Sequence, residues 1–112
     1  MTTQHYPVYP PLNGTVLLPD LPDFNLQHNA ALPAYVYSSM PGFVTEISFL
    51  EFGRACHRVA HAVRPNHAGP EGKVVALIAN TDTILYQAIV AGMVRAGVVV
   101  CTDIYIQYLN LI

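Results

Sequence analysis

The stretch from Lys73 to Val100 reads KVVALIANTDTILYQAIVAGMVRAGVVV, and its order of residues decides the fold. An apolar run of strand length, 74–79, precedes three residues that favour helix starts. A helical pattern then runs from about Thr83 to Ala96, Gly97 is a suitable helix stop, and a second run of valines follows. This order predicts one parallel βαβ unit with a right-handed crossover, and therefore the α/β class.

The apolar residues of this unit are too many for the unit to bury by itself. Residues 74–79 show no alternation of polar and apolar side chains, which predicts a strand covered on both faces. The helix is apolar almost all round, and its large side chains cannot all face one neighbour: Ile84, Leu85, Tyr86, Ile89, Val90, Met93 and Val94. We therefore expect the chain to supply only the opening part of a larger parallel-sheet domain.

The segment before this unit predicts a β-hairpin that leads directly into a helix. Residues 34–37 and 44–47 are β-prone and flank a turn, 38–43, that contains Pro41-Gly42. Ser48 and Glu51 match a capping box, in which each side chain accepts a hydrogen bond from the other residue's backbone N–H. The apolar stripe of the helix is Phe49, Phe52, Cys56, Val59, Ala60 and Val63. The side expected to face solvent carries Arg54, His57, Arg58, His61 and Arg64, and Pro65 should end the helix.

The two ends of the chain differ in composition from this middle part. Residues 1–33 hold six of the nine prolines and no Lys or Arg, which predicts an extended, loop-rich arm without a long helix. Residues 101–112 are expected to form a divergent apolar tail. Most of this tail, IYIQYLNLI, is β-prone, uncharged and free of proline, which is typical of an aggregation-prone segment.

Composition limits the class of protein and its partners. Of 112 residues, 53% are hydrophobic and 11% charged, whereas charged residues usually make up about 25% of a chain. The net charge of −2 and the absence of a basic cluster argue against a nucleic-acid partner. The most apolar window, 84–101, is shorter than the roughly 20 residues of a membrane span and contains Gln87 and Arg95. Without a span, a secretory signal or a disulfide framework, we expect a cytoplasmic protein.

Histidines supply one candidate metal site. His57 and His61 lie four residues apart on the predicted helix, a spacing that lets two imidazoles share a metal ion, and His67 is near in sequence. The metalloprotease pattern would need Glu at position 58, which is Arg58. Zinc usually takes three or four protein ligands, so two solvated histidines are the favoured interpretation.

Two further candidates are weighed in the same way. Cys56 lies on the apolar stripe, where a small buried side chain is favoured over a catalytic thiol, and Cys101 is interpreted likewise. Residues 80–82 (Asn-Thr-Asp) follow a strand, where ligands of α/β sheets bind, but these residue types also cap helices. Capping is favoured because no glycine-rich phosphate loop accompanies them. The sequence therefore assigns no catalytic, cofactor-binding or metal-binding residue.

The order of these features resembles the start of the adenylate-forming superfamily of acyl-CoA synthetases, luciferases and nonribosomal adenylation domains. The family's "T-Y-x-E-L" helix corresponds to 47–52, its "G-D-x-V-A-L…N" strand to 72–77 with Asn80, and its "K-A-G-A-V" helix end to 95–99. The proline-rich arm around 21–25 is most similar to fungal enzymes of the adenylation–carrier–reductase type. The resemblance covers roughly residues 20–99.

This resemblance implies an incomplete N-terminal part of the adenylate-forming fold, with 34–100 as a partial AMP-binding subdomain. The family uses ATP and Mg²⁺ to convert a carboxylic acid into an acyl-adenylate, and then passes the acyl group to a thiol. Its phosphate loop, ribose-binding aspartate and catalytic lysine have no counterpart in these 112 residues. The resemblance therefore implies no cofactor bound by this segment, and we expect it to be inactive alone.

Two other functions stay open at the level of sequence. The chain could be an interaction module that docks on a partner, or self-associates, through its apolar helix and tail. It could also be a small independent α/β domain that binds a ligand. The sequence names no carboxylate substrate for any of these functions.

Overall fold

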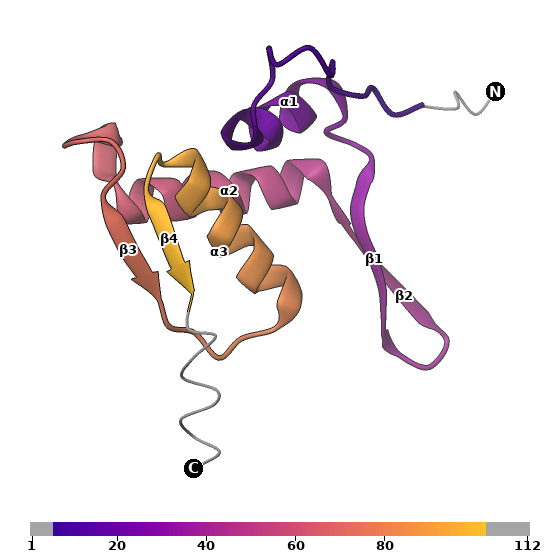
Figure 1. Cartoon of the computed structure of the whole chain (residues 1–112). Helices are drawn as coiled ribbons and strands as arrows, with labels where there is room; N and C mark the ends of the chain where they lie inside the picture. The colour runs from indigo at the N-terminus through magenta and orange to yellow at the C-terminus, as the bar shows by residue number, and fades with distance from the viewer. Residues whose placement is uncertain (1–5, 103–112) are drawn as a thin grey trace.

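The computed structural model describes residues 6–102, so most of the tail predicted at 101–112 lies outside the described residues. Along the chain the elements are η1 (Leu18–Asp20), α1 (Leu21–His28), β1 (Pro33–Met40), β2 (Phe43–Ser48), α2 (Phe49–Val63), η2 (Pro65–His67), β3 (Val74–Leu77), α3 (Thr83–Arg95) and β4 (Val99–Thr102). β1 and β2 form one sheet, and β3 and β4 form a second. In Figure 1 the hairpin lies at one end of α2, and the β3–β4 sheet lies toward the other end.

The predicted βαβ unit is confirmed. β3 and β4 pair in parallel, with Val74 opposite Val99, and α3 connects them. Asp82 caps α3 by accepting a hydrogen bond from the Leu85 N–H at 2.9 Å. Gly97 follows the helix with φ of +77°, a conformation that side chains other than glycine rarely adopt. β4 extends to Thr102, so the expected boundary between subdomain and tail at residue 100 falls inside a strand.

Within the described residues the first strand is covered on one face only, and its coverage on both faces in a larger domain stays a prediction. Val75, Leu77 and Val100 point toward the core, which α2 and α3 supply. Val74 and Val99 point the other way and keep 66% and 51% of their surface exposed. Within residues 6–102 helices cover only one side of this sheet, so the strands alternate between buried and exposed positions.

The hairpin and the helix after it are also confirmed, with longer strands than expected. β1 and β2 are antiparallel, and only Pro41 and Gly42 separate them. Ser48 Oγ accepts the Glu51 N–H at 3.2 Å, but the Glu51 carboxylate lies 3.3 Å from the Ser48 hydroxyl and is not shown to accept the Ser48 N–H. Only one of the two reciprocal hydrogen bonds of the capping box is therefore shown, the one accepted by Ser48 Oγ. The helix ends before Pro65, as predicted.

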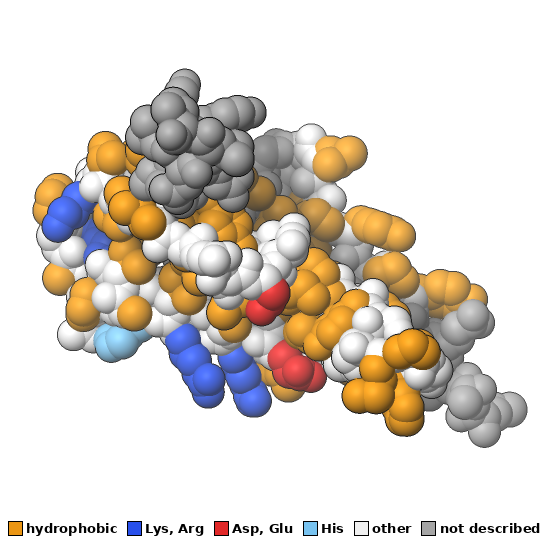
Figure 2. Space-filling model, turned by 90° about the horizontal axis from the view of Figure 1, so that it is seen from below, with side chains coloured by type: hydrophobic (Ala, Val, Ile, Leu, Met, Phe, Trp, Pro, Cys, Tyr) orange, Lys and Arg blue, Asp and Glu red, His pale blue; other side chains and the backbone are white. Residues whose placement is uncertain are grey.

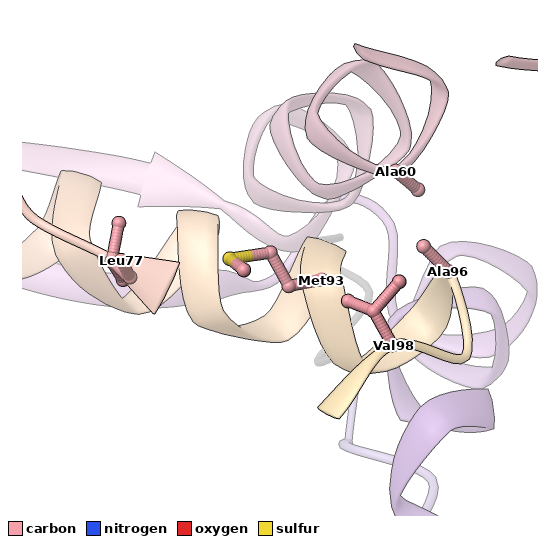
Figure 3. Packing of buried hydrophobic residues seen from close by; sticks show 5 residues of the cluster. All are labelled: Ala60, Leu77, Met93, Ala96 and Val98. Carbon is pink, nitrogen blue, oxygen red and sulfur yellow. The ribbon is translucent and has the colours of Figure 1, made fainter. Parts of the chain in front are cut away.

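The core lies where α2 crosses α3 above the β3–β4 sheet. Its buried members are Ala60, Leu77, Met93, Ala96 and Val98, and Figure 3 shows Ala60 and Ala96 directed toward one another between the helices. A Cβ atom at Gly92 would lie 2.6 Å from the Cys56 carbonyl oxygen. A glycine at this position is what lets α3 approach α2 so closely.

The expected extended arm contains the short α-helix α1, preceded by the 3-10 helix η1, which corrects the prediction for residues 21–28. Proline did not prevent it, because Pro22 lies in the first turn of α1, where its missing N–H needs no partner. Asn29, just after α1, accepts the Val8 N–H at 2.7 Å and donates to the Val8 carbonyl at 2.8 Å. The N-terminal segment is thereby folded back along α1.

Candidate functional site

An apolar cleft of about 580 Å³ lies between the N-terminal helical segment, α2 and α3. Leu21 of α1, Phe49 and Phe52 of α2, and Val90 and Val94 of α3 line it. Its volume falls within the range of about 300–1,000 Å³ that small-molecule sites occupy. A few polar side chains also reach its surface, so the cleft is the largely apolar kind of hollow in which ligands or protein segments are bound.

Two close contacts shape this cleft. A Cβ atom at Gly53 would lie 2.5 Å from Leu26 Cγ, so glycine lets α1 pack directly on α2. The Tyr35 ring of the hairpin packs on Phe52 with centroids 5.3 Å apart, and its hydroxyl hydrogen-bonds to Gln87 Oε1 of α3. Burial, with a smaller contribution from Cys56, raises the pKa of Tyr35, so the phenol stays neutral. The hairpin is thus anchored to both long helices.

The carboxylate of Asp23 joins three helices beside the cleft. Arg95 of α3 donates to it from Nε, at 3.2 Å to each oxygen, and from Nη2 at 3.0 Å to Oδ2. His57 Nε2 of α2 contacts Oδ1. Burial opposes ionisation here, but the hydrogen bonds and charges of Arg95 and His57 outweigh it and lower the pKa of Asp23. Asp23 therefore fixes α1 on the α2–α3 pair as a carboxylate.

The prediction that Arg64 faces solvent is wrong, because its side chain is only 8% exposed. Its guanidinium donates to the carbonyl oxygens of Ala68 at 2.9 Å, Gly69 at 2.6 Å and Ala96 at 2.8 Å. These carbonyls come from the loop after α2 and from the end of α3. Helical spacing could not reveal this role, since Arg64 follows the last turn of α2 and turns back toward the core.

Glu71 completes the surroundings of Arg64. Its Oε1 accepts from Arg64 Nη1 at 2.9 Å and lies 2.9 Å from His67 Nε2. The hydrogen bond from Arg64, followed by that from His67, lowers the pKa of Glu71. A Cβ atom at Gly97 would lie 2.1 Å from Glu71 Oε2, so this carboxylate also lies against the turn that leads into β4.

Two of the three candidate histidines belong to these two clusters, one to each. His57 contacts Asp23, His67 contacts Glu71, and His61 lies on the exposed side of α2. A polar hollow of about 290 Å³ is lined by all three imidazoles together with Arg64 and Arg95. No group of three or more His, Cys, Asp or Glu in residues 6–102 is placed to hold a metal ion.

The two cysteines have different surroundings. Cys56 is fully buried, and burial raises its pKa to about 11, so it serves as a small core side chain, as expected. Cys101, which was interpreted in the same way, is exposed on β4. The reason for this correction is the uncovered side of the β3–β4 sheet, toward which Cys101 points.

Of residues 80–82, Asp82 caps α3 through its side chain, as favoured. None of the helices within residues 6–102 is long and apolar enough to cross a membrane.

The side-chain contacts that join distant segments could not be predicted from the sequence. Asp23 and Arg95 are 72 residues apart, and Tyr35 and Gln87 are 52 apart. The opposite charges of the few acids in the arm and of the one cation in α3 were the only sequence feature that could indicate an ion pair. Opposite charge alone does not identify which acid pairs with Arg95 unless the fold is known.

Comparison with known proteins gives three relatives. The chain is 56% identical over 92 residues to adenylate-forming reductase Nps9, and 50% identical over 91 residues to adenylate-forming reductase Nps11, both of Serpula lacrymans var. lacrymans (strain S7.9). It is 33% identical over 97 residues to adenylate-forming reductase Nps10 of Heterobasidion annosum. The matches cover 79–82% of this chain but only 8–9% of the relatives. No protein-family profile and no solved structure matches the chain.

Proposed function

This chain is homologous to a segment of the adenylate-forming reductases, and on that premise we propose that it is the opening part of an ATP-dependent, carboxylate-activating enzyme. Residues 34–100 are the partial AMP-binding subdomain in this proposal. The observation that carries it is the identity of 56% over 82% of the chain. The fold supports it, because a hairpin, a helix and a parallel βαβ unit follow in the order that the resemblance implies.

The chemistry of such an enzyme would join a carboxylic acid to the AMP part of ATP, with Mg²⁺ and release of pyrophosphate. The acyl group would then pass to a thiol, with release of AMP. The described residues do not fit a Mg²⁺ site, since no group of three or more possible ligands lies together. Asp23 and Glu71, two carboxylates with lowered pKa, are already paired with Arg95 and Arg64. We therefore assign this segment a structural role and no catalytic step.

Carboxylate-dependent ATP–pyrophosphate exchange tests the proposal in two preparations. Residues 1–112 alone should show no exchange above a heat-denatured sample. A chimera in which residues 21–92 of this chain replace the matching residues of the relative Nps9 should retain exchange, because the segment supplies the same structural part. Exchange by the 112-residue chain alone, or a folded chimera without exchange, would contradict the proposal.

An interaction module is the second candidate, and exposed apolar side chains favour it. Val36, Phe43 and Val44 of the hairpin and Ile78 after β3 are all largely exposed. Figure 2 shows one face of the molecule, on which hydrophobic side chains are widespread and charged ones are few. Size-exclusion chromatography with light scattering separates the candidates: a defined oligomer of residues 1–112 favours the module.

A further inference from the structure

We propose that residues 104–112 of this chain, which lie outside the described residues, occupy the apolar cleft between the N-terminal helical segment, α2 and α3. The occupant of the cleft is thus a segment of the same polypeptide. The inference does not depend on the function proposed above, because it concerns residues that follow the resemblance to adenylate-forming enzymes, which covers roughly residues 20–99.

The walls of the cleft retain apolar surface that the described residues do not cover. Leu18 of η1 keeps 69% of its surface exposed, and Phe49 and Phe52 of α2 are only half-buried. Thr83 and Gln87 of α3 also line the cleft, and their hydroxyl and amide groups are hydrogen-bond donors and acceptors. Apolar walls with a few such groups suit a peptide, because its backbone N–H and C=O groups need partners when they are buried.

Residues 104–112, with the sequence IYIQYLNLI, match these walls in chemistry. Seven of the nine residues are Ile, Leu or Tyr, the other two are the amides Gln107 and Asn110, and none is charged. Removal of such apolar side chains from water is favourable in proportion to the area that is buried. The segment also carries no charge that would lose its hydration inside an apolar cleft.

The connectivity of the chain keeps this segment within reach of the cleft. β4 ends at Thr102, which pairs with Leu77 of β3, and adjacent strands lie about 4.8 Å apart. Six residue steps lead from Leu77 to Thr83 in the cleft wall, and they span at most about 22 Å. Thr102 therefore lies within about 27 Å of Thr83, whereas the ten residues 103–112 reach about 33–36 Å when extended.

Covalent attachment favours this segment over a second copy of the chain. A site and a segment that are joined by a short flexible linker meet at an effective concentration in the millimolar range. In a solution of about 1 μM protein, the same segment of another chain is roughly a thousandfold more dilute at the cleft. Docking within one chain also removes from solvent a segment whose composition is typical of aggregation.

Thiol labelling of the full chain tests the inference. Cys101→Ser removes the exposed native thiol, and Leu18→Cys then places one thiol in the wall of the cleft. Leu12→Cys is the matched control, because this position is fully exposed in the same N-terminal segment and does not line the cleft. Since labelling requires exposure of the thiol, we expect the Leu18→Cys site to react with a maleimide at least about tenfold more slowly than the control in native buffer, and equally fast in urea.

A double substitution in the tail, Ile106→Asp with Leu109→Asp, then identifies the occupant. Two carboxylates cannot enter an apolar cleft without the loss of their hydration, so this variant should release the tail from the cleft. The Leu18→Cys site should then react within about twofold of the Leu12→Cys control, since Leu18 is largely exposed in the absence of the tail.

Three results would overturn the inference. One is an equal native rate at Leu18→Cys and Leu12→Cys in the chain with the unaltered tail. Another is slow labelling that persists in the variant with Ile106→Asp and Leu109→Asp, because a different segment then covers the cleft. The third is protection that disappears on dilution, which shows a second copy in the cleft. If Leu18→Cys does not fold, Thr83→Cys, at an exposed position of the same cleft, gives the same comparison.

Discussion

Asp23 of α1 accepts hydrogen bonds from both Nε and Nη2 of Arg95 at the end of α3, across 72 residues of sequence. His57 of α2 contacts the same carboxylate, so three helices meet at one side chain. The apolar cleft lies between the same three elements. The contact therefore holds the N-terminal segment in the position that forms one wall of the cleft.

Replacement of Asp23 by Asn should weaken this attachment. The substitution removes the charge that Arg95 pairs with, while it preserves the size of the side chain. Because both partners are partly exposed, at 47% and 30%, the free energy of unfolding should fall by about 1 kcal/mol or less. Urea denaturation measures the change, and Glu46→Gln on the exposed side of β2 is the matched control. Equal stability of the two variants would contradict the role of Asp23.

The contribution of Asp23 should depend on acid pH. Its pKa is lowered from the ordinary value of 3.8, so the folded state holds the proton less tightly than the unfolded state does. The stabilisation is therefore fully present above about pH 4 and is lost as the pH falls through the folded-state pKa. Unfolding curves of the native chain and of Asp23→Asn should converge below pH 3.8. A difference that persists at lower pH would show that the carboxylate charge is not its source.

Truncation of Arg64 should lower the free energy of unfolding more than replacement of Asp23 does. Arg64→Ala leaves the carbonyls of Ala68, Gly69 and Ala96 without their donor in a largely buried setting. Hydrogen bonds to charged groups stabilise by about 1.5–3 kcal/mol, so we expect a loss of about 2–4 kcal/mol. Arg58→Ala, on the exposed side of α2, is the control and should change stability by about 0.5 kcal/mol or less. Similar effects of the two changes would refute the structural role of Arg64.

Alanine at Gly92 should destabilise the chain, although alanine normally favours a helix over glycine by about 1 kcal/mol. The new Cβ atom would lie 2.6 Å from the Cys56 carbonyl oxygen, which cannot move without shifting α2. Overpacking of this kind costs about 1–3 kcal/mol. Gly53→Ala is a useful comparison. The three atoms nearest to its Cβ all belong to the flexible Leu26 side chain, which can move, so this change should cost less. Thermal unfolding of both variants gives the order of the two effects.

The two thiols should differ sharply in reactivity. The pKa of Cys56 is raised to about 11 by burial, and its side chain is inaccessible. Cys101 is exposed, so one thiol per folded chain should react with a thiol reagent at pH 8, and two should react in urea. Cys101→Ser should abolish the native reaction and leave the reaction of Cys56 in urea. Two reactive thiols in the folded chain would contradict the packing of α2 on α3.

The ends of helices that are marked by capping residues or proline could be predicted from the sequence. Ser48 and Asp82 begin α2 and α3 because their side-chain oxygens satisfy backbone N–H groups of the first turn, and Pro65 ends α2 because it disfavours helix in the preceding residue. The helix α1 was not predicted, since Pro22 suggested an extended chain, although proline is tolerated in a first turn. Arg64 was predicted to be exposed and is buried, whereas Cys101 was predicted to be buried and is exposed. Burial depends on which distant segments pack against a residue, and the local sequence does not specify them.

The sequence by itself determined the hairpin, two helices, the parallel βαβ unit and the likeness to adenylate-forming enzymes. Periodicity and capping act between residues a few positions apart, so they can be read along the chain. Only the tertiary structure decided that Asp23 meets Arg95, that Arg64 is buried, and that Val74 and Val99 share an uncovered face. These relationships depend on how helices and strands distant in sequence pack together, and no local preference of the chain specifies that packing.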